Sequence, residues 1–391
     1  MTTGTTAAGT ETTTIDEKKT SGGGGSALWG MPDIYPKHQR PRTVSLGELL
    51  RTTIPQREHL IFPWLRQRES AMVFAAPGVG KSFFALSLAM AVAGGGKALG
   101  KWEAPRARRV LYVDGEMPMD DLQDRVRSLM PSVGGDAEKL EKNFHFEARQ
   151  KQPGGVIFTD LSDPLSRETL IYRATEARAE LIILDNLSTL ATLKDENSAS
   201  EFTDIIKFIL RLKQEGIACL LVHHSNKGGE TYRGSSNLVA PFEVVIGLVG
   251  MDLKATDRPG VTRFRLSWPK YRAEKDADTG RTLDFAFEQG VPSFQDEGGG
   301  KGCIQWTCSL AEDTKIEQLL EYVRSEEGWS QRSLATVFEV SGATINKWKA
   351  KAIKQGLITE KEWREAKKGG KDSDNEREGA NDGQPSEDTD Y

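Results

Sequence analysis

The chain has 391 residues and a mass of 43.1 kDa, which is enough for two or three domains and at least one core of roughly two hundred residues. Hydrophobic residues make up 37% and charged residues 28%, so most of the chain can fold and its polar, Gly-rich segments are expected at the ends. The apolar runs are far shorter than the roughly 18 to 20 residues that span a bilayer, which excludes the membrane-spanning class. The first residues lack a cationic start followed by an apolar segment, so we expect no secretory signal and a cytoplasmic location.

The formal net charge of −5 is unevenly distributed along the sequence. Residues 372–391 carry −7, which leaves +2 for residues 1–371, and residues 331–371 alone carry +6. A basic segment directly before an acidic tail suggests an anionic partner and an intramolecular competitor for it. A solvated surface with a solubilising tail would give the same pattern.

The three cysteines, Cys219, Cys303 and Cys308, indicate no cross-linked scaffold. Their number is odd, and the only close pair has C-x4-C spacing without neighbouring histidines. We therefore expect ordinary thiols and neither a disulfide framework nor a structural zinc site.

The chain begins with a Thr/Gly-rich arm that has almost no large apolar side chains. Such a segment cannot bury enough surface to offset its chain entropy. We expect a disordered arm over residues 1–40, an α/β domain over 41–311, a helical domain over 312–368 and a disordered acidic tail over 369–391. Within the second of these, residues 45–52 have a helix-like pattern.

Short apolar runs and helical patterns then alternate along the chain, which predicts a mostly parallel sheet covered on both faces. The expected strands are 71–75, 110–114, 144–148, 181–185, 218–223 and 244–249. The expected helices are 81–93, 118–129, 164–179 and 200–215. Beyond residue 249 the pattern becomes antiparallel, with strands at 262–268, 283–287 and 304–310. The sequence therefore predicts β-hairpins added at one edge of the sheet.

The first buried strand runs into the segment APGVGKS and then into an apolar helical pattern. Strand, Gly-rich loop and helix form the context of a P-loop, in which backbone N–H groups and the helix N-terminus bind phosphate oxygens. We expect Lys81 to reach the β- and γ-phosphates of ATP and Ser82 to ligate Mg²⁺. Ala75 stands where the motif has its first glycine, and this difference affects the backbone geometry at the entry to the loop. The residues expected to bind the nucleotide are Pro77, Gly78, Val79, Gly80, Lys81 and Ser82.

Two predicted strands end in carboxylates that suit nucleotide hydrolysis, which needs an acid for the metal and a base for the attacking water. Asp185 follows four apolar residues and is expected to hold the metal through water. Glu116 lies in the loop after the strand that ends at Asp114. We assign Glu116 as the general base because it projects further over the site, and interpret Asp114 as a strand-end or capping acid.

The ordered set GVGKS, VLYVDGEMP, LIILDNL, LLVHHSNKGG with YRGSSNL, and WPKYR resembles the RecA-like ATPases. Within them it is most similar to the hexameric replicative helicases of the plasmid RepA and DnaB type, over roughly residues 45–290. The resemblance implies a RecA-like fold, ATP and Mg²⁺ as cofactors, a hexamer that encircles single-stranded DNA, and a replication initiator or primase as a further partner.

The resemblance also assigns roles to single residues. It matches Glu116 to the catalytic glutamate, Asp185 to the metal-orienting acid, and His224 to the residue that senses the γ-phosphate. Adjacent histidines at a strand end would otherwise be one buried and one exposed core-edge residue. The element KYR matches one that reaches into a neighbouring subunit's nucleotide, which makes Arg272 an arginine finger; solvated Lys and Arg side chains after a strand are the alternative.

Two loops leave the carboxyl ends of the central strands, where the resemblance implies contacts with DNA. The loop over residues 226–237 contains Lys227, Tyr232 and Arg233, which suit phosphate contact and base stacking. The loop over residues 192–200 is acidic on balance, and we assign it no DNA contact.

The helical patterns over 331–338 and 343–355 predict a helix-turn-helix, open to a winged form, whose second helix enters a major groove. Ser330 would cap the first helix, Ser341 and Gly342 would form the turn, and Gly356 would end the second. A small protein-docking domain remains the alternative. The expected core residues are Leu334, Ala335, Val337, Val340, Ile345, Trp348 and Ile353. The expected outward-facing, DNA-binding residues are Thr344, Asn346, Lys347, Lys349 and Lys351.

Together these features predict an ATP-dependent DNA helicase or translocase of a plasmid, phage or mobile element. Two alternatives stay open: a non-motor regulator whose DNA binding is gated by ATP, and a filament-forming recombination or repair ATPase.

Overall fold

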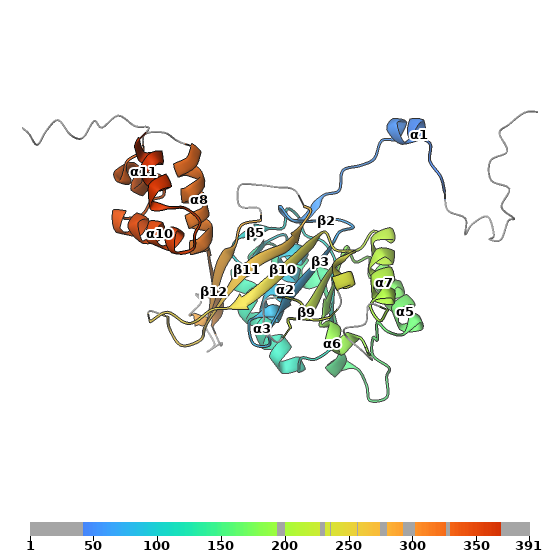
Figure 1. Ribbon diagram of the computed structural model, residues 1–391. Coiled ribbons are helices and arrows are strands. Elements are labelled where there is room, and N and C mark those ends of the chain that lie inside the picture. The colour runs from blue at the N-terminus through green and yellow to red at the C-terminus, as the bar shows by residue number, and fades with distance from the viewer. Residues whose placement is uncertain are drawn as a thin grey trace, which may run out of the picture. The chain divides into compact units, whose positions relative to one another are not determined.

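The computed structural model of the chain (Figure 1) describes residues 42–193, 200–226, 231–234, 236–255, 257–273, 280–291, 302–325 and 329–368. The described residues up to Gln56 and those from Arg57 onward are two separate compact units. The first contains helix α1 (Leu46–Arg51), whose N-cap residue Ser45 accepts a hydrogen bond from the amide of Glu48 at 3.2 Å. The predicted N-terminal arm and acidic tail lie outside the described residues.

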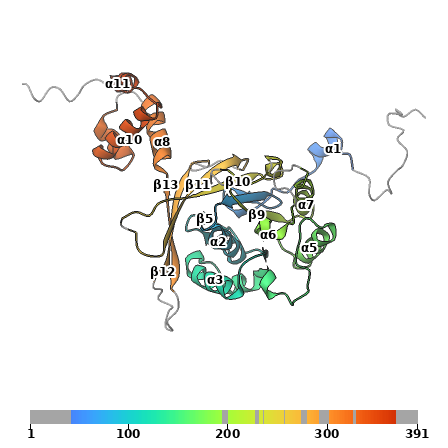
Figure 2. The same cartoon turned by 60° about the horizontal axis from the view of Figure 1, so that its bottom comes forward.

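The second unit contains a nine-stranded sheet with the order β13-β12-β11-β10-β3-β9-β8-β6-β7. Strands β10, β3, β9, β8, β6 and β7 are parallel, and β11, β12 and β13 extend the sheet by antiparallel pairing. Figure 2 shows these three strands at the end of the sheet that is remote from α5 and α7. The predicted mixed sheet with edge hairpins is confirmed. The strands are β3 (Ser70–Ala75), β6 (Val110–Asp114), β7 (Phe144–Ala148), β8 (Leu181–Asp185), β9 (Ala218–His224), β10 (Val244–Gly250), β11 (Val261–Tyr271), β12 (Leu283–Val291) and β13 (Cys303–Leu310).

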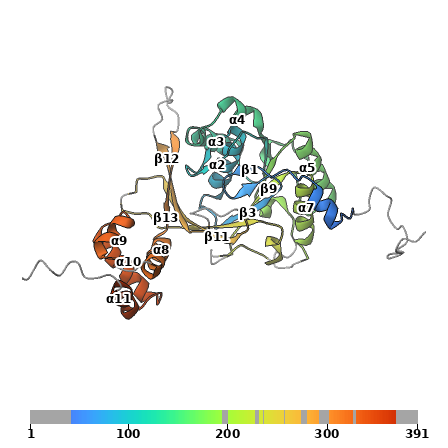
Figure 3. The ribbon, with the colours of Figure 1, turned by 90° about the horizontal axis from the view of Figure 1, so that it is seen from above.

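The near-continuous apolar strands place alternate side chains on opposite faces of the sheet. In β8, for example, Leu181 and Ile183 join one core, whereas Ile182 and Leu184 join the other. Helices α2 to α4 cover the first face and α5 to α7 the second, and Figure 3 shows β9 between these two groups. The helices are α2 (Lys81–Gly94), α3 (Met119–Val133), α4 (Ala137–Asn143), α5 (Pro164–Glu176), α6 (Leu187–Leu190) and α7 (Thr203–Gln214).

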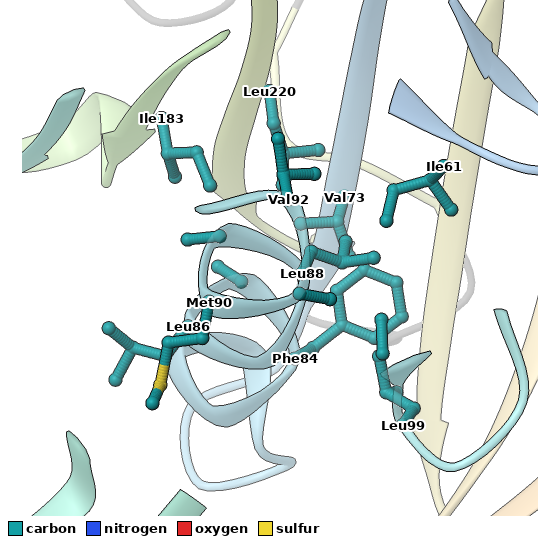
Figure 4. Packing of buried hydrophobic residues seen from close by; sticks show 14 of the residues in the cluster. Ile61, Val73, Phe84, Leu86, Leu88, Met90, Val92, Leu99, Ile183 and Leu220 are labelled. Carbon is teal, nitrogen blue, oxygen red and sulfur yellow. The ribbon is translucent and has the colours of Figure 1, made fainter. Parts of the chain in front are cut away.

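Helix α2, which follows the phosphate loop, is buried along almost its whole length. Its Phe84 and Leu88 pack with Val73 of β3 and Leu220 of β9 in one cluster (Figure 4). A helix that is apolar on all sides belongs in the interior of a large domain, so the N-terminus of α2 is held firmly at the carboxyl end of β3.

Several short elements were not predicted because their sequences are too short for a clear periodicity. These elements are two short two-stranded ribbons and two 3₁₀ turns that connect longer elements. They are β1 (His59–Ile61), β2 (Leu65–Arg66), β4 (Lys97–Ala98), β5 (Trp102–Glu103), η2 (Arg149–Lys151) and η3 (Ser236–Val239).

The C-terminal region forms a helical cluster around its own core, in which Leu334, Ile345 and Trp348 are buried. Val337, predicted to be in that core, is half exposed, because α9 ends at this residue. Its elements are α8 (Glu312–Ser325), α9 (Gln331–Val337), α10 (Gly342–Lys354) and α11 (Glu360–Lys368). Residues 312–325 and 329–368 contain no strand, so helix α11 follows α10 where the winged form would have a β-hairpin. None of the helices described in the chain is long and apolar enough to cross a bilayer.

Candidate active site

The Gly-rich loop between β3 and α2 has the backbone that a phosphate-binding loop requires. Gly78 and Gly80 have φ angles of 79° and 109°, a left-handed region that side chains with a Cβ rarely adopt. A Cβ on Gly80 would also lie 3.0 Å from Phe287. Ala75, which replaces the first glycine of the motif, is simply the last residue of β3 and pairs with His224. Its position therefore needs no glycine.

Lys81 is the first residue of α2 and points back into the loop. Its Nζ donates to the carbonyl oxygens of Ala75 and Ala76, both at 3.0 Å, and the residue is only 8% exposed. Burial lowers the pKa of the Lys81 ammonium, while the charges of Asp185 and Glu116 act in the opposite direction. The ammonium group is therefore a buried cation beside two carboxylates.

Asp185 ends β8 beneath this loop and is almost completely buried. Its Oδ2 accepts a hydrogen bond from the Tyr112 hydroxyl at 2.6 Å. Burial raises the pKa of Asp185, and the hydrogen bonds from Tyr112 and Ser82 oppose that shift. Burial also raises the pKa of Tyr112 well above its usual value, so the phenol stays a donor. The Ser82–Asp185 contact is the pair expected to hold a hydrated metal.

Glu116 lies in the loop after β6 and is exposed to the cleft. Its Oε2 accepts a hydrogen bond from the Asn186 side-chain amide at 2.8 Å. Asp114 has a different position: its Oδ1 accepts from the backbone amides of Glu116 and Met117, at 2.9 and 2.6 Å. The Asp114 carboxylate therefore shapes the turn that presents Glu116, in agreement with its interpretation as a strand-end acid.

The two histidines at the end of β9 face opposite sides of the sheet, as neighbours on a strand must. His224 lines the cleft, and burial, followed by the charge of Lys81, lowers its pKa. His223 is buried on the other face, where its Nε2 donates to the carbonyl oxygen of Arg233 at 2.8 Å. Burial lowers the pKa of His223 to about 4.

The segment after β9 folds back onto its own starting point. The amide of Arg233 donates to the carbonyl oxygen of His224 at 3.0 Å, and Ser225 bridges to Tyr232. The ring of Tyr232 packs edge-on against Phe74 of β3, with centroids 5.8 Å apart. The base of the loop predicted to contact DNA is thus fixed beside the cleft. Lys227 of that loop lies outside the described residues.

These elements surround one cleft of about 460 Å³ at the carboxyl ends of β3, β6, β8 and β9. Of the residues predicted for the site, eight line it: Pro77, Gly78, Gly80, Lys81, Ser82, Glu116, Asp185 and His224. Val79 is instead partly buried against the core. Another wall comes from outside the predicted motifs, and its lining residues are Phe83, Arg125, Thr262, Phe287 and Gln289.

Arg272 does not line this cleft. It follows β11, where Tyr271 pairs with Val244 at the amino end of β10, and it is exposed at the edge of the sheet opposite the phosphate loop. Its neighbour Lys270 is held in place, because its Nζ donates to the carbonyl oxygens of Val239 at 2.6 Å and Ala240 at 3.2 Å. Within one chain, Arg272 and the cleft are therefore separate.

The residues predicted on α10 fall into two groups. Lys349 is 24% exposed, pairs with Glu360 at 2.8 Å and covers the ring of Trp363, while Lys351 pairs with Glu312 at 3.5 Å. These two lysines join α10 to α11 and α8. Lys347 also pairs with Glu312, at 3.2 Å, but its side chain is 72% exposed. Thr344 is half-buried in the first turn of α10, where its amide donates to the side chain of the N-cap residue Ser341. The exposed stripe of α10 consists of Ala343, Asn346, Lys347, Ala350 and Lys354.

Several residues of the site were missed by the sequence interpretation. Asn186 directly follows Asp185, and a polar side chain beside a predicted metal acid was the signal that could have found it. Tyr112 was missed because its aromatic ring fits the apolar pattern of β6. Phe287 and Gln289 reach the cleft only through the pairing of distant strands, so no local pattern points to them.

The residues present fit ATP with Mg²⁺. The loop glycines leave backbone room, Lys81 supplies a buried positive charge, and the Ser82–Asp185 pair offers oxygen ligands of the kind that magnesium prefers. The guanidinium group of Arg125 lies 4.9 Å from the ring centre of Phe83, and the two side chains form an aromatic and cationic wall of the cleft.

The comparison with known families agrees with this geometry. The family model described as AAA domain matches residues 35–230, which contain the loop, both carboxylates and the histidine pair. A search among curated proteins finds no match to the chain. Because the family model spans half of the chain, and because the cleft has the features of a P-loop site, the chain belongs to the AAA domain family and is an ATPase of the P-loop class.

Proposed function

We propose that the protein is an ATP-dependent DNA helicase or translocase that works as a ring-shaped oligomer. The observation that carries this proposal is the link between cleft and loop at the end of β9. The imidazole of His224 lines the cleft, while the backbone of the same residue is bonded to Arg233, which closes the base of loop 226–237. A displacement of His224 on hydrolysis would therefore move a loop whose composition suits DNA.

The residues of the cleft have distinct tasks. The backbone amides after Gly78 and the Lys81 ammonium bind phosphate oxygens, and Ser82 and Asp185 would hold the metal. Glu116 orients the attacking water and accepts its proton. When bound, Mg²⁺ supplies the charge that stabilises the departing phosphate oxygens.

Arg272 is proposed to act on the cleft of a neighbouring subunit. Its exposed place at the opposite sheet edge supports this role, because it does not serve the cleft of its own chain. An arginine finger supplied by a neighbour raises the hydrolysis rate of other nucleotidases by about 10³ to 10⁵. This requires the active sites to lie between subunits, as in the hexamers that the motif order resembles.

The C-terminal helices are proposed to bind duplex DNA as a helix-turn-helix. Asn346, Lys347 and Lys354 share the exposed stripe of α10, with small alanines between them that allow close approach to a groove. The resemblance to replicative helicases favours a role in the replication of a plasmid, phage or mobile element, with an initiator or primase as partner.

The test combines ATP hydrolysis with strand separation. Steady-state ATPase activity is measured with and without single-stranded DNA, and unwinding is measured on a forked duplex. We expect stimulation by DNA and ATP-driven unwinding for the wild type, and loss of both in Lys81→Ala and Glu116→Gln. The control variants Lys97→Ala and Glu103→Gln change exposed residues of β4 and β5 and should retain activity.

Three outcomes would contradict the proposal. Hydrolysis that is unaffected by Lys81→Ala would show that the cleft is not the site. ATP-dependent DNA binding without unwinding would favour the non-motor regulator, and DNA-coating filaments in electron micrographs would favour the recombination ATPase.

A further inference from the structure

Arg149 lies outside the cleft but joins two of the segments that form it. It begins the turn η2 directly after β7. Its Nε donates to the carbonyl oxygen of Gly115 at 3.0 Å, and its Nη2 donates to the carbonyl oxygen of Thr189 at 2.6 Å. Its guanidinium group also lies 4.6 Å from the ring centre of Phe158. One side chain thus bridges the loop that carries Glu116 and the helix α6.

The two segments bridged by Arg149 pack closely against each other. A Cβ on Gly115 would lie 2.2 Å from the Thr189 hydroxyl oxygen. The amide of Gly115 donates to the carbonyl oxygen of Asp185 at 2.8 Å, directly before α6 begins. The loop after β6 can therefore approach α6 closely only because residue 115 has no side chain.

Helix α6 in turn supplies the group that holds Glu116. Asn186 is its N-cap residue and forms a capping box with Thr189. The Oδ1 of Asn186 accepts from the amide of Thr189, which leaves its Nδ2 to donate to Glu116 at 2.8 Å. The direction of the Asn186 amide, and with it the position of the Glu116 carboxylate, depends on where α6 lies relative to the loop.

We propose that Arg149 is a positioning residue for Glu116. By bonding to the loop and to α6 at once, Arg149 fixes the distance between them. This distance determines where Asn186, the N-cap residue of α6, holds the Glu116 carboxylate. This inference rests on the proposed role of Glu116 as the base for the attacking water. Arg149 does not line the cleft, so its loss should leave nucleotide affinity nearly unchanged and lower the turnover number, roughly 10²-fold for a displacement of about 1 Å.

The experiment uses the full chain and compares Arg149→Met, Arg149→Lys and the control Arg173→Met. Arg173 belongs to the neighbouring helix α5 and contacts Thr159 and Glu147, each at 3.0 Å. Its loss removes the same charge without touching the Gly115 loop. Thermal unfolding checks that each variant is folded, a non-hydrolysable ATP analogue gives the dissociation constant, and steady-state kinetics give kcat and KM.

We expect Arg149→Met to lower kcat with an unchanged dissociation constant, Arg173→Met to resemble the wild type, and Arg149→Lys to recover only part of the rate. A lysine keeps the charge, but its single nitrogen cannot reproduce the fork that reaches both carbonyl groups. Asn186→Ala should lower kcat similarly. Because both changes act through Glu116, the double variant should be hardly slower than the slower single variant.

Three results would overturn the inference. They are full kcat in Arg149→Met, an equal loss of kcat in Arg173→Met, or independent, multiplying effects of Arg149→Met and Asn186→Ala. If the wild type hydrolyses ATP and Glu116→Gln does not, such a result removes the role of Arg149 alone. If the wild type does not hydrolyse ATP, or Glu116→Gln is fully active, the proposed function fails and this inference fails with it.

Discussion

His223 makes the stability of the protein sensitive to acid, although it does not face the cleft. Its Nε2 hydrogen is used by the Arg233 carbonyl, and its Nδ1 is buried without a partner among the described residues. A second proton on this ring would therefore enter a site that offers it no acceptor. This explains why burial lowers the pKa of His223 to about 4.

The first prediction concerns the pH dependence of unfolding. The folded pKa of about 4 lies below the unfolded value of 6.5, so only the unfolded chain binds this proton between the two values. The free energy of unfolding is therefore largest above pH 6.5, and it decreases by about 3 kcal/mol as the pH falls to 4. Denaturant titrations should show this decrease in the wild type, relative to His223→Gln, whose amide can still donate to Arg233. Parallel acid dependence of the two proteins would contradict the prediction.

The second prediction separates two reasons why glycine is needed in the phosphate loop. Gly78→Ala introduces only left-handed strain of roughly 1 to 2 kcal/mol, because nothing lies within 4 Å of its missing Cβ. Gly80→Ala adds the contact with Phe287 at 3.0 Å. Chemical unfolding should therefore find Gly80→Ala the less stable variant. Phe287→Leu should restore part of that difference in Gly80→Ala and none in Gly78→Ala, and equal effects in both backgrounds would refute the steric argument.

At the scale of elements, the third prediction divides the lysines of α10 between two tasks. Lys347 and Lys354 lie on the exposed stripe, whereas Lys349 is packed on Trp363 and paired with Glu360. Lys354→Ala should weaken binding to duplex DNA and reduce the salt slope by about one, with little effect on unfolding. Lys349→Ala should instead destabilise the C-terminal helices by about 1 kcal/mol. DNA titrations at several salt concentrations and thermal unfolding distinguish the two, and the reverse assignment would show that α10 presents another face.

Elements with a strong local pattern were predicted closely from the sequence. Strands β6, β7 and β8 have the predicted bounds, and α2 begins at Lys81 as expected, since apolar runs bounded by polar turns define buried strands. The shortest elements and the helix α11 were missed, because α11 is almost entirely polar and is anchored through Trp363 by tertiary packing. In the site, the side chains at strand ends could be predicted from the sequence. The presence of Arg125, Asn186 and Phe287 could not, because it depends on how distant segments pack.

At the scale of the whole molecule, the separation of Arg272 from the cleft leads to the fourth prediction. If the site is completed by a neighbour, Arg272→Ala chains keep an intact cleft and Glu116→Gln chains keep an intact finger. Each variant alone should be inactive, and their mixture should recover part of the wild-type ATPase rate, because some interfaces combine the two intact halves. The control is a mixture of Glu116→Gln with Lys81→Ala, in which no cleft is intact. Full activity of Arg272→Ala alone would exclude the shared site.

The walls of the cleft come from different parts of the chain. The phosphate loop and the hydrolytic residues lie within residues 35–230, which the AAA domain model matches, whereas Thr262, Phe287 and Gln289 belong to the antiparallel strands that follow. Changes in those strands can reshape one wall of the cleft while the hydrolytic residues stay the same. The shape of the nucleotide site can therefore vary separately from its hydrolytic residues, through strands that lie beyond the residues matched by the AAA domain model.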